Sequence, residues 1–166
     1  MIADLARRSA RIATRVEVPA QSLLLLAIRV CWGWRFFQTG LGKLRGIEQT
    51  TAYFAQLGIP LPGLNATMAG TTECLGGLFL LLGLSSRLAS VPLIFTMCVA
   101  YLTAEFPALR GIFSDPDAFF ASAPFLFLFA ALLVLVFGPG RFSIDHWIGS
   151  RIASRVAMQS PSASPI

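Results

Sequence analysis

Ionisable residues inside long apolar segments are the part of this sequence that could support chemistry. Arg29 and Arg35 lie in the first apolar run, Glu73 lies in the second, and Glu105 directly follows the third. An ionised side chain at the centre of a bilayer costs ~2.5–3.5 kcal/mol on insertion scales unless it is paired or hydrated. These charges therefore predict either a structural ion pair or a polar cavity for a small anion, a quinone headgroup or protons.

Depth along the helices predicts which charges pair. At ~1.5 Å per residue, Arg35 is about 8 Å and Glu73 about 10 Å from the external ends of their runs, and Arg29 is about 17 Å deep. The long side chain of Arg29 can reach towards the outside. We therefore expect Glu73 to pair with one of the two arginines. Because these lie about 120° apart around the helix, the other needs Glu105, a hydroxyl such as that of Tyr101, water, or the membrane surface.

Residues that would hold a cofactor are scarce. A haem in a helical bundle needs axial ligands such as His or Met, and the single histidine, His146, follows the last apolar run. No Walker loop, GxGxxG or HExxH motif occurs. The three cysteines, Cys31, Cys74 and Cys98, form no CxxC pattern and are interpreted as packing residues. We predict no metal and no covalently bound cofactor, so that a diffusible quinone or a partner protein would bring the electrons of any redox reaction.

The elements that must position these charges are four apolar runs, near residues 20–40, 66–84, 88–104 and 118–138. Each approaches the roughly twenty residues that a helix needs to cross a bilayer. Of the 166 residues, 55% are hydrophobic and 13% are charged, whereas a water-soluble domain carries about a quarter charged residues. The sequence therefore predicts an all-α integral membrane four-helix bundle, with the lipid bilayer as its surroundings.

The arginines outside these runs lie mostly on one side of the predicted membrane, before the first run, between the second and third, and after the fourth. Positive residues collect on the cytoplasmic side, which places both termini in the cytoplasm of a bacterial cell and the protein in its inner membrane. The net charge of +5 is divided between the two sides rather than gathered in one patch, so nucleic acid is not an expected partner.

Three parts follow from this pattern. Residues 1–18 form a basic amphipathic segment expected at the cytoplasmic surface, residues 19–148 form the four-helix domain, and residues 149–166 form a cytoplasmic tail with a disordered end. Short helices on the membrane surface are predicted at 47–57 and 144–156.

Two connections have a predicted geometry. The three residues 85–87 that join the second and third runs are short enough to force an antiparallel helical hairpin. Ser114 or Asp117 is expected to cap the fourth run.

Three motifs follow one another along the chain. The first contains Arg29, Gly33, Phe36-Phe37, Gly40 and Lys43-Leu44. The second contains Leu57-Gly58-Ile59-Pro60 with Pro62, then Glu73, Gly76-Gly77-Leu78, Gly83-Leu84 and Arg87. The third is Phe137-Gly138-Pro139-Gly140-Arg141-Phe142-Ser143-Ile144-Asp145. In this order, over roughly residues 23–148, they resemble the DoxX family of small four-span bacterial membrane proteins.

The resemblance implies that Arg29, Lys43 and Glu73 match the family's polar positions, whereas Arg35 is an addition of this sequence. Some relatives are subunits of thiosulfate:quinone oxidoreductase or terminal quinol oxidase systems, and others associate with membrane oxidoreductase complexes. We therefore expect an accessory or quinone-interacting subunit of a membrane redox system, with a membrane or peripheral oxidoreductase as partner. The alternatives are a small anion or weak-acid transporter and a purely structural scaffold. The candidate binding residues are Arg29, Arg35, Lys43, Glu73, Tyr101 and Glu105.

Overall fold

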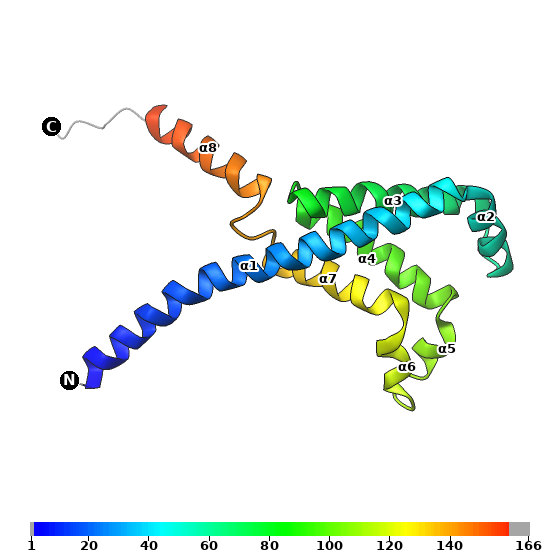
Figure 1. Cartoon of the computed structure of the whole chain (residues 1–166), viewed down its shortest axis with the longest axis horizontal. Helices are drawn as coiled ribbons and strands as arrows, with labels where there is room; N and C mark the ends of the chain where they lie inside the picture. Colours follow the sequence, from blue (N-terminus) through cyan, green and yellow to red (C-terminus); the bar gives the residue numbers. More distant parts are fainter. Residues whose placement is uncertain (1, 160–166) are drawn as a thin grey trace.

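The computed structural model describes the backbone of residues 2–159 and the side chains of residues 19–152. Within these residues the chain is helical and contains no strand, as predicted. Figure 1 shows one long helix, α1, with α2 to α7 gathered along its second half and α8 leading away from them. The helices are α1 (Ile2–Arg45), α2 (Ile47–Gln56), α3 (Pro62–Leu82), α4 (Ser86–Thr103), α5 (Phe106–Arg110), α6 (Pro116–Ala121), α7 (Ala123–Phe137) and α8 (Ile144–Gln159).

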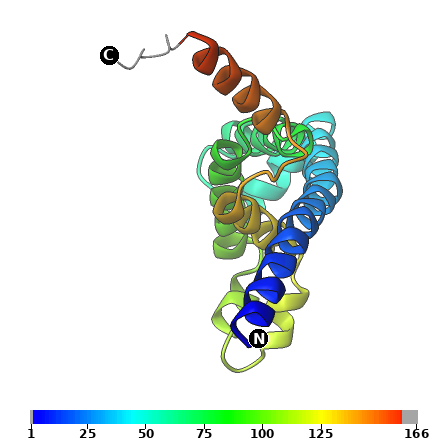
Figure 2. The ribbon, with the colours of Figure 1, turned by 90° about the vertical axis from the view of Figure 1, so that its left-hand side faces the viewer.

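The four longer helices of the packed region contact one another in a closed order: α1 packs against α3, α3 against α4, α4 against α7, and α7 against α1. Their shared core consists of Phe36, Leu80, Leu93, Met97, Ala131 and Val134. Figure 2 looks along these helices from the end at which α8 leaves them. We call this the α8 end, and we call the opposite end, which carries α2, α5 and α6, the α2 end.

The hairpin between α3 and α4 has the predicted antiparallel form. Gly83 and Ser85 both adopt positive φ angles, of 71° and 46°, and so reverse the chain within three residues. Left-handed backbone is natural for glycine but unusual for serine. Hydrogen bonds with the segment that follows α7 hold this turn in place.

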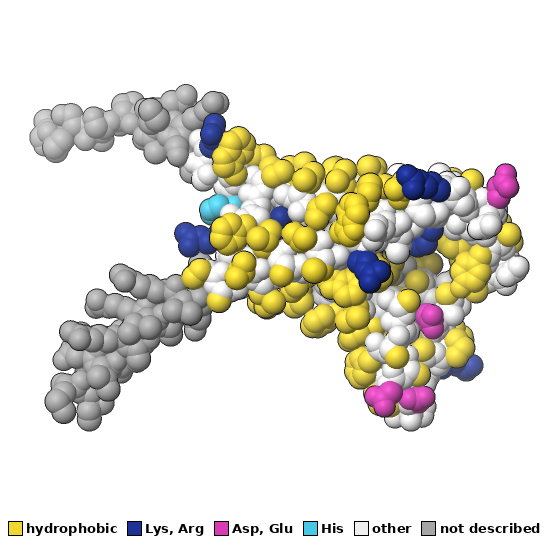
Figure 3. Space-filling view, in the orientation of Figure 1, with side chains coloured by type: hydrophobic (Ala, Val, Ile, Leu, Met, Phe, Trp, Pro, Cys, Tyr) yellow, Lys and Arg dark blue, Asp and Glu magenta, His cyan; other side chains and the backbone are white. Residues whose placement is uncertain are grey.

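The outer surface of the packed helices is apolar. Leu88, Phe95, Leu102 and Val136 are all at least 60% exposed, and Figure 3 shows hydrophobic side chains over most of the packed helices on the visible face. Large exposed apolar surfaces mark contact with a membrane or another protein. Among the described residues, α4 is the one helix that is long and apolar enough by itself to cross a membrane, and α7 is apolar but shorter.

The first and the fourth predicted runs differ most from the structure. A helix was expected to begin near residue 20. In the structure this region belongs to α1, which begins at Ile2, runs without a break and contains Pro19. The run predicted at 118–138 is divided at Ser122, whose backbone is extended, into α6 and α7. Ser122 donates its hydroxyl to the Tyr101 hydroxyl at 2.7 Å, and Tyr101 in turn donates to the Phe119 carbonyl at 3.0 Å, which fixes the break.

The predicted cap of this run is wrong. Neither Ser114 nor Asp117 but Asp115 caps α6, by accepting a hydrogen bond from the Ala118 amide at 3.3 Å. The reason is Pro116, which occupies the first helical position. Proline is favoured there because it has no amide hydrogen to satisfy, so the residue before it becomes the cap.

The two short helices predicted at 47–57 and 144–156 are confirmed as helices, α2 and α8, and α5 is an additional one. Their position on a membrane surface stays a prediction, as does that of residues 1–18, whose side chains are not described. The disordered end predicted for the tail, residues 160–166, lies outside the described residues.

Candidate functional site

The buried carboxylate of Glu73 forms an ion pair with Lys43. The Lys43 ammonium donates to Oε1 of Glu73, and the exposed fractions of the two side chains are 32% and 1%. Lys43 lies in the last turn of α1, and Glu73 lies in the middle of α3. The expected pairing of Glu73 with Arg29 or Arg35 is therefore wrong.

The register between α1 and α3 explains the difference. The two helices pack through glycines: a Cβ at Gly40 would contact the backbone of Cys74, and a Cβ at Gly33 would lie 2.7 Å from the Leu81 amide nitrogen. Small residues allow such close approach of two membrane helices. In this antiparallel register Glu73 faces the segment just after Gly40. Arg29 is displaced from that segment by about 18 Å, or twelve residues at ~1.5 Å each.

Arg29 is buried, with 1% of its surface exposed, and its guanidinium is satisfied by backbone carbonyls rather than by a carboxylate. It donates to the carbonyls of Leu80 at 2.9 Å, Phe142 at 3.1 Å and Leu81 at 3.4 Å, and also to that of Pro139. The last carbonyls of a helix lack intrahelical partners and carry the negative end of the helix dipole. Arg29 therefore joins the end of α3 to the segment after α7.

Asp145 ties the same segment to the start of α4. Its carboxylate accepts hydrogen bonds from the amides of Ser85 at 2.7 Å and Ser86 at 3.1 Å, and its own amide donates to the Gly83 carbonyl at 3.0 Å. Ser85 itself makes no side-chain cap. This role of Asp145 was not predicted from the sequence, although Asp145 closes the third motif. Two features of the sequence could have indicated it. The third motif ends in an acidic residue, and α4 begins at a position where a carboxylate from another segment can supply the cap.

Removal of the Asp145 carboxylate should weaken the α3–α4 turn. We expect Asp145→Ala to lower the free energy of unfolding by about 1–2 kcal/mol, the usual cost of a lost N-terminal cap, measured by denaturant titration in detergent. Asp117→Ala, which changes an exposed acidic residue in the first turn of α6, is the matched control. An equal effect of the two substitutions would contradict the assignment.

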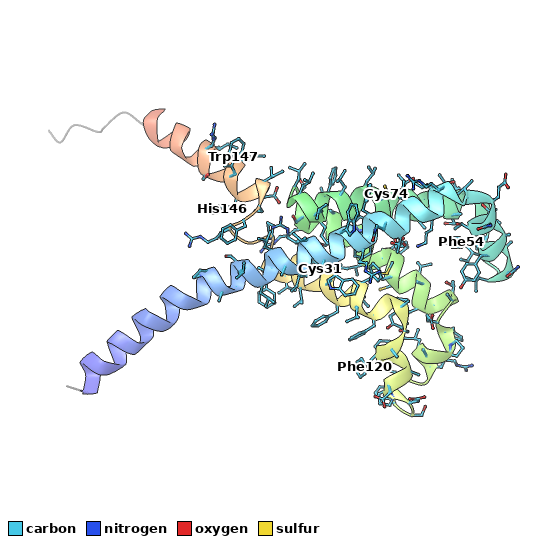
Figure 4. All side chains as sticks on the ribbon, in the orientation of Figure 1. Cys31, Phe54, Cys74, Phe120, His146 and Trp147 are labelled. Carbon is cyan, nitrogen blue, oxygen red and sulfur yellow. The ribbon has the colours of Figure 1, made fainter. Side chains whose placement is uncertain are left out.

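A cavity of about 520 Å³ lies at the α2 end of the packed helices. The Lys43–Glu73 pair forms part of its wall, Glu105 from the end of α4 lines it as well, and Phe54 of α2 is another of its wall residues. Figure 4 labels Phe54 at this end and His146 and Trp147 at the opposite one. The remaining wall residues are Thr39, Tyr53, Leu57, Ile59, Asn65, Met68, Ala69, Thr72, Pro92, Phe95, Thr96, Met97, Val99, Ala100, Thr103, Ala104, Ala123, Pro124 and Phe127.

The cavity brings together half of the polar residues singled out in the sequence. Lys43, Glu73 and Glu105 line it, whereas Arg29, Arg35 and Tyr101 do not. Arg35 is exposed on the outside of α1. The buried Tyr101 donates its hydroxyl to the Phe119 carbonyl at 3.0 Å. The aromatic and aliphatic wall contributed by α2 and α4 was missed, because apolar residues of a membrane helix carry no sequence signal that separates a cavity wall from a lipid-facing surface.

The cysteine and histidine side chains predicted from the sequence to have no ligand role do not line this cavity. Cys31, Cys74 and Cys98 are all free thiols; Cys31 and Cys98 are exposed on the helix surface and Cys74 is half-buried. His146 is exposed at the start of α8. Within the described residues no three histidine, cysteine, aspartate or glutamate side chains converge into a group that could hold a metal ion.

Comparison with known proteins agrees with the motifs. The DoxX family pattern matches residues 24–106. The chain is 31% identical over 134 residues to an uncharacterized membrane protein of Mycobacterium tuberculosis. The matched region covers 76% of this chain and 82% of that protein. It is 30% identical over 128 residues to the inner membrane protein YphA of Escherichia coli, covering 76% and 91%.

A shorter match, 34% identical over 83 residues, covers 50% of this chain and 60% of the Bacillus subtilis protein named "Putative oxidoreductase CatD". No solved structure matches the chain. The family pattern and the two longer matches together show that this chain is a membrane protein and belongs to the DoxX family.

Proposed function

We propose that α1, α3, α4 and α7 form a four-helix bundle across the cytoplasmic (inner) membrane, with both termini in the cytoplasm. Three observations support this orientation. The free part of α1 and helix α8 leave the packed helices at the same end (Figure 1). The acidic side chains visible in Figure 3 lie at the α2 end, and most arginines outside the apolar runs fall on the other side, as expected for cytoplasmic segments.

We propose further that the protein is an accessory, quinone-binding subunit of a membrane redox system. The observation that carries this proposal is the cavity at the α2 end, which combines a mostly apolar wall with the Lys43–Glu73 pair. A small-molecule site is typically 300–1,000 Å³, apolar, and supplied with a few polar groups that orient the ligand. A quinone ring has these needs: two apolar faces and two oxygens that require hydrogen bonds.

In this proposal the chain binds and orients, and a partner oxidoreductase transfers the electrons. The Lys43 ammonium offers a charge-assisted hydrogen bond to a ring oxygen, and the aromatic side chain of Phe127 in the cavity wall offers an apolar contact for the ring. The relative named as an oxidoreductase supports a redox setting, although the match covers little more than half of that protein.

Transport of an anion or weak acid is a weaker proposal. The apolar core residues Phe36, Leu80, Leu93, Ala131 and Val134 are fully or almost fully buried and separate the cavity from the α8 end. A permeating ion would have to cross this packed apolar layer.

Quinone content tests the proposal. The protein purified in a mild detergent should carry bound quinone, detected by solvent extraction and chromatography. We expect Lys43→Met to lower the bound amount at least about tenfold, because a charge-assisted hydrogen bond is worth roughly 1.5–3 kcal/mol.

Arg45→Met is the matched control. Arg45 is an exposed cation in the same last turn of α1 and does not line the cavity, so its substitution should leave the quinone content unchanged. Folded native protein that neither retains nor takes up quinone would refute the proposal.

A further inference from the structure

We propose that the cavity at the α2 end prefers the reduced, hydroxyl-bearing form of its ligand, a quinol, over the oxidised quinone, and that Glu73 makes the distinction. This inference rests on the proposed function and deepens it, because it states which redox form the site stabilises. It concerns binding alone.

The inference starts from the second oxygen of Glu73. Oε1 accepts from the Lys43 ammonium, whereas the buried Oε2 has no hydrogen-bond partner among the described residues. A buried carboxylate oxygen without a donor is costly, and a ligand that supplies the donor removes that cost. Since the side chain is only 1% exposed, a donor for Oε2 has to come from inside the protein, and Glu73 lines the cavity that could hold one.

Other polar side chains of the cavity wall are already engaged. The hydroxyls of Thr39, Thr96 and Thr103 donate to carbonyls one helical turn back, at 3.0, 2.9 and 2.8 Å. The Asn65 amide group donates to the Pro60 carbonyl at 2.6 Å. The hydroxyl-bearing residues Tyr53 and Thr72 also belong to the wall, so Oε2 of Glu73 is distinguished by its own lack of a donor and not by a general excess of acceptors.

The two redox forms of a quinone differ in this respect. A quinol hydroxyl can donate to Oε2 of Glu73, whereas a quinone carbonyl can only accept and would bring a second acceptor beside the carboxylate. The last torsion of a glutamate side chain is soft, so Oε2 can turn towards the ligand while Oε1 keeps its bond to Lys43. The Lys43 ammonium has further hydrogens and can donate to either form, so it does not discriminate.

The test is a competition assay under reducing, anaerobic conditions for the quinol arm. Purified protein in detergent holds a radiolabelled decyl-substituted benzoquinol, which is displaced by unlabelled quinol, by the corresponding quinone, or by the dimethyl ether of the quinol. The ether has a similar shape and no donor. We expect quinol to bind at least about tenfold more tightly than either competitor, because it alone adds a hydrogen bond to a charged acceptor.

Four variants locate the donor's partner. Glu73→Gln should bring the quinol-to-ether ratio close to one, and Glu73→Asp, which keeps the carboxylate, should retain part of the preference if the glutamine variant fails to fold. Glu105→Gln removes the other carboxylate of the cavity wall and should still bind quinol more tightly than the ether. Glu48→Gln, at an exposed carboxylate of α2 that does not line the cavity, is the control that should leave the ratio unchanged.

The outcomes separate the two proposals. Equal affinity for quinol, quinone and ether would overturn this inference and leave the proposed function intact. Loss of the preference in Glu105→Gln instead of Glu73→Gln would also overturn it. No binding of any of the three compounds to folded protein would overturn the proposed function itself.

Discussion

Replacing Arg29 by methionine should lower the free energy of unfolding by about 3 kcal/mol or more. The substitution keeps the volume of the buried stem but removes the hydrogen bonds that Arg29 donates to the carbonyls of Leu80, Leu81, Pro139 and Phe142. Of these, the Leu80 carbonyl still accepts from the Gly83 amide. Hydrogen bonds to charged groups contribute about 1.5–3 kcal/mol, and several are lost together. Denaturant titration in detergent, followed by circular dichroism, measures the effect.

Arg35→Met is the control for this prediction, because Arg35 lies on the same helix, carries the same charge and is exposed. Its substitution should change stability by no more than about 0.5 kcal/mol. Arg29→Lys should recover only part of the loss, since an ammonium cannot reproduce the fork of donors that reaches two separate segments. A stability of Arg29→Met close to that of Arg35→Met would show that the carbonyl contacts are dispensable.

The second large effect is expected at Gly77, one of the glycines through which α1 and α3 approach each other closely. A Cβ there would lie 2.5 Å from the Phe37 amide nitrogen, 2.7 Å from the Phe36 Cβ and 2.8 Å from the Gly33 carbonyl oxygen. Backbone atoms cannot move aside as a flexible side chain can, so the helices must separate. We expect Gly77→Ala to cost about 1–3 kcal/mol by overpacking and to weaken the Lys43–Glu73 pair, which depends on the same register.

Gly42→Ala provides the opposite case on α1. A Cβ at Gly42 meets nothing within 4 Å, and alanine is favoured over glycine in a helix interior by up to about 1 kcal/mol. The control variant should therefore be as stable as the native protein or slightly more stable. If both glycines tolerate alanine equally in the same denaturant titration, the close approach of α1 and α3 is not as described.

Much of the fold follows from local patterns. The apolar runs give the helical elements, because a backbone in lipid must satisfy its own hydrogen bonds. The short link 85–87 gives the hairpin, since so few residues cannot connect helices in any other arrangement. The order of the three motifs gives the family. Predictions from local patterns were wrong at the ends of the last run. Asp115, and not one of its neighbours, caps α6. Ser122 divides the run because its hydroxyl binds that of Tyr101, a residue distant in the sequence.

The sequence by itself indicated that Arg29 and Glu73 had to be sheltered, since the cost of an unpaired ion in lipid does not depend on the fold, whereas Arg35, expected to need a partner as well, is exposed. Only the tertiary structure decided their partners. The glycine contacts between α1 and α3 set a register that brings Lys43 to Glu73 and sends Arg29 to the end of α3. A register is fixed by shape complementarity between two surfaces, and depth counted along separate helices contains no information about it. The cavity has the same origin, because its wall is assembled from helices that meet only in the folded protein.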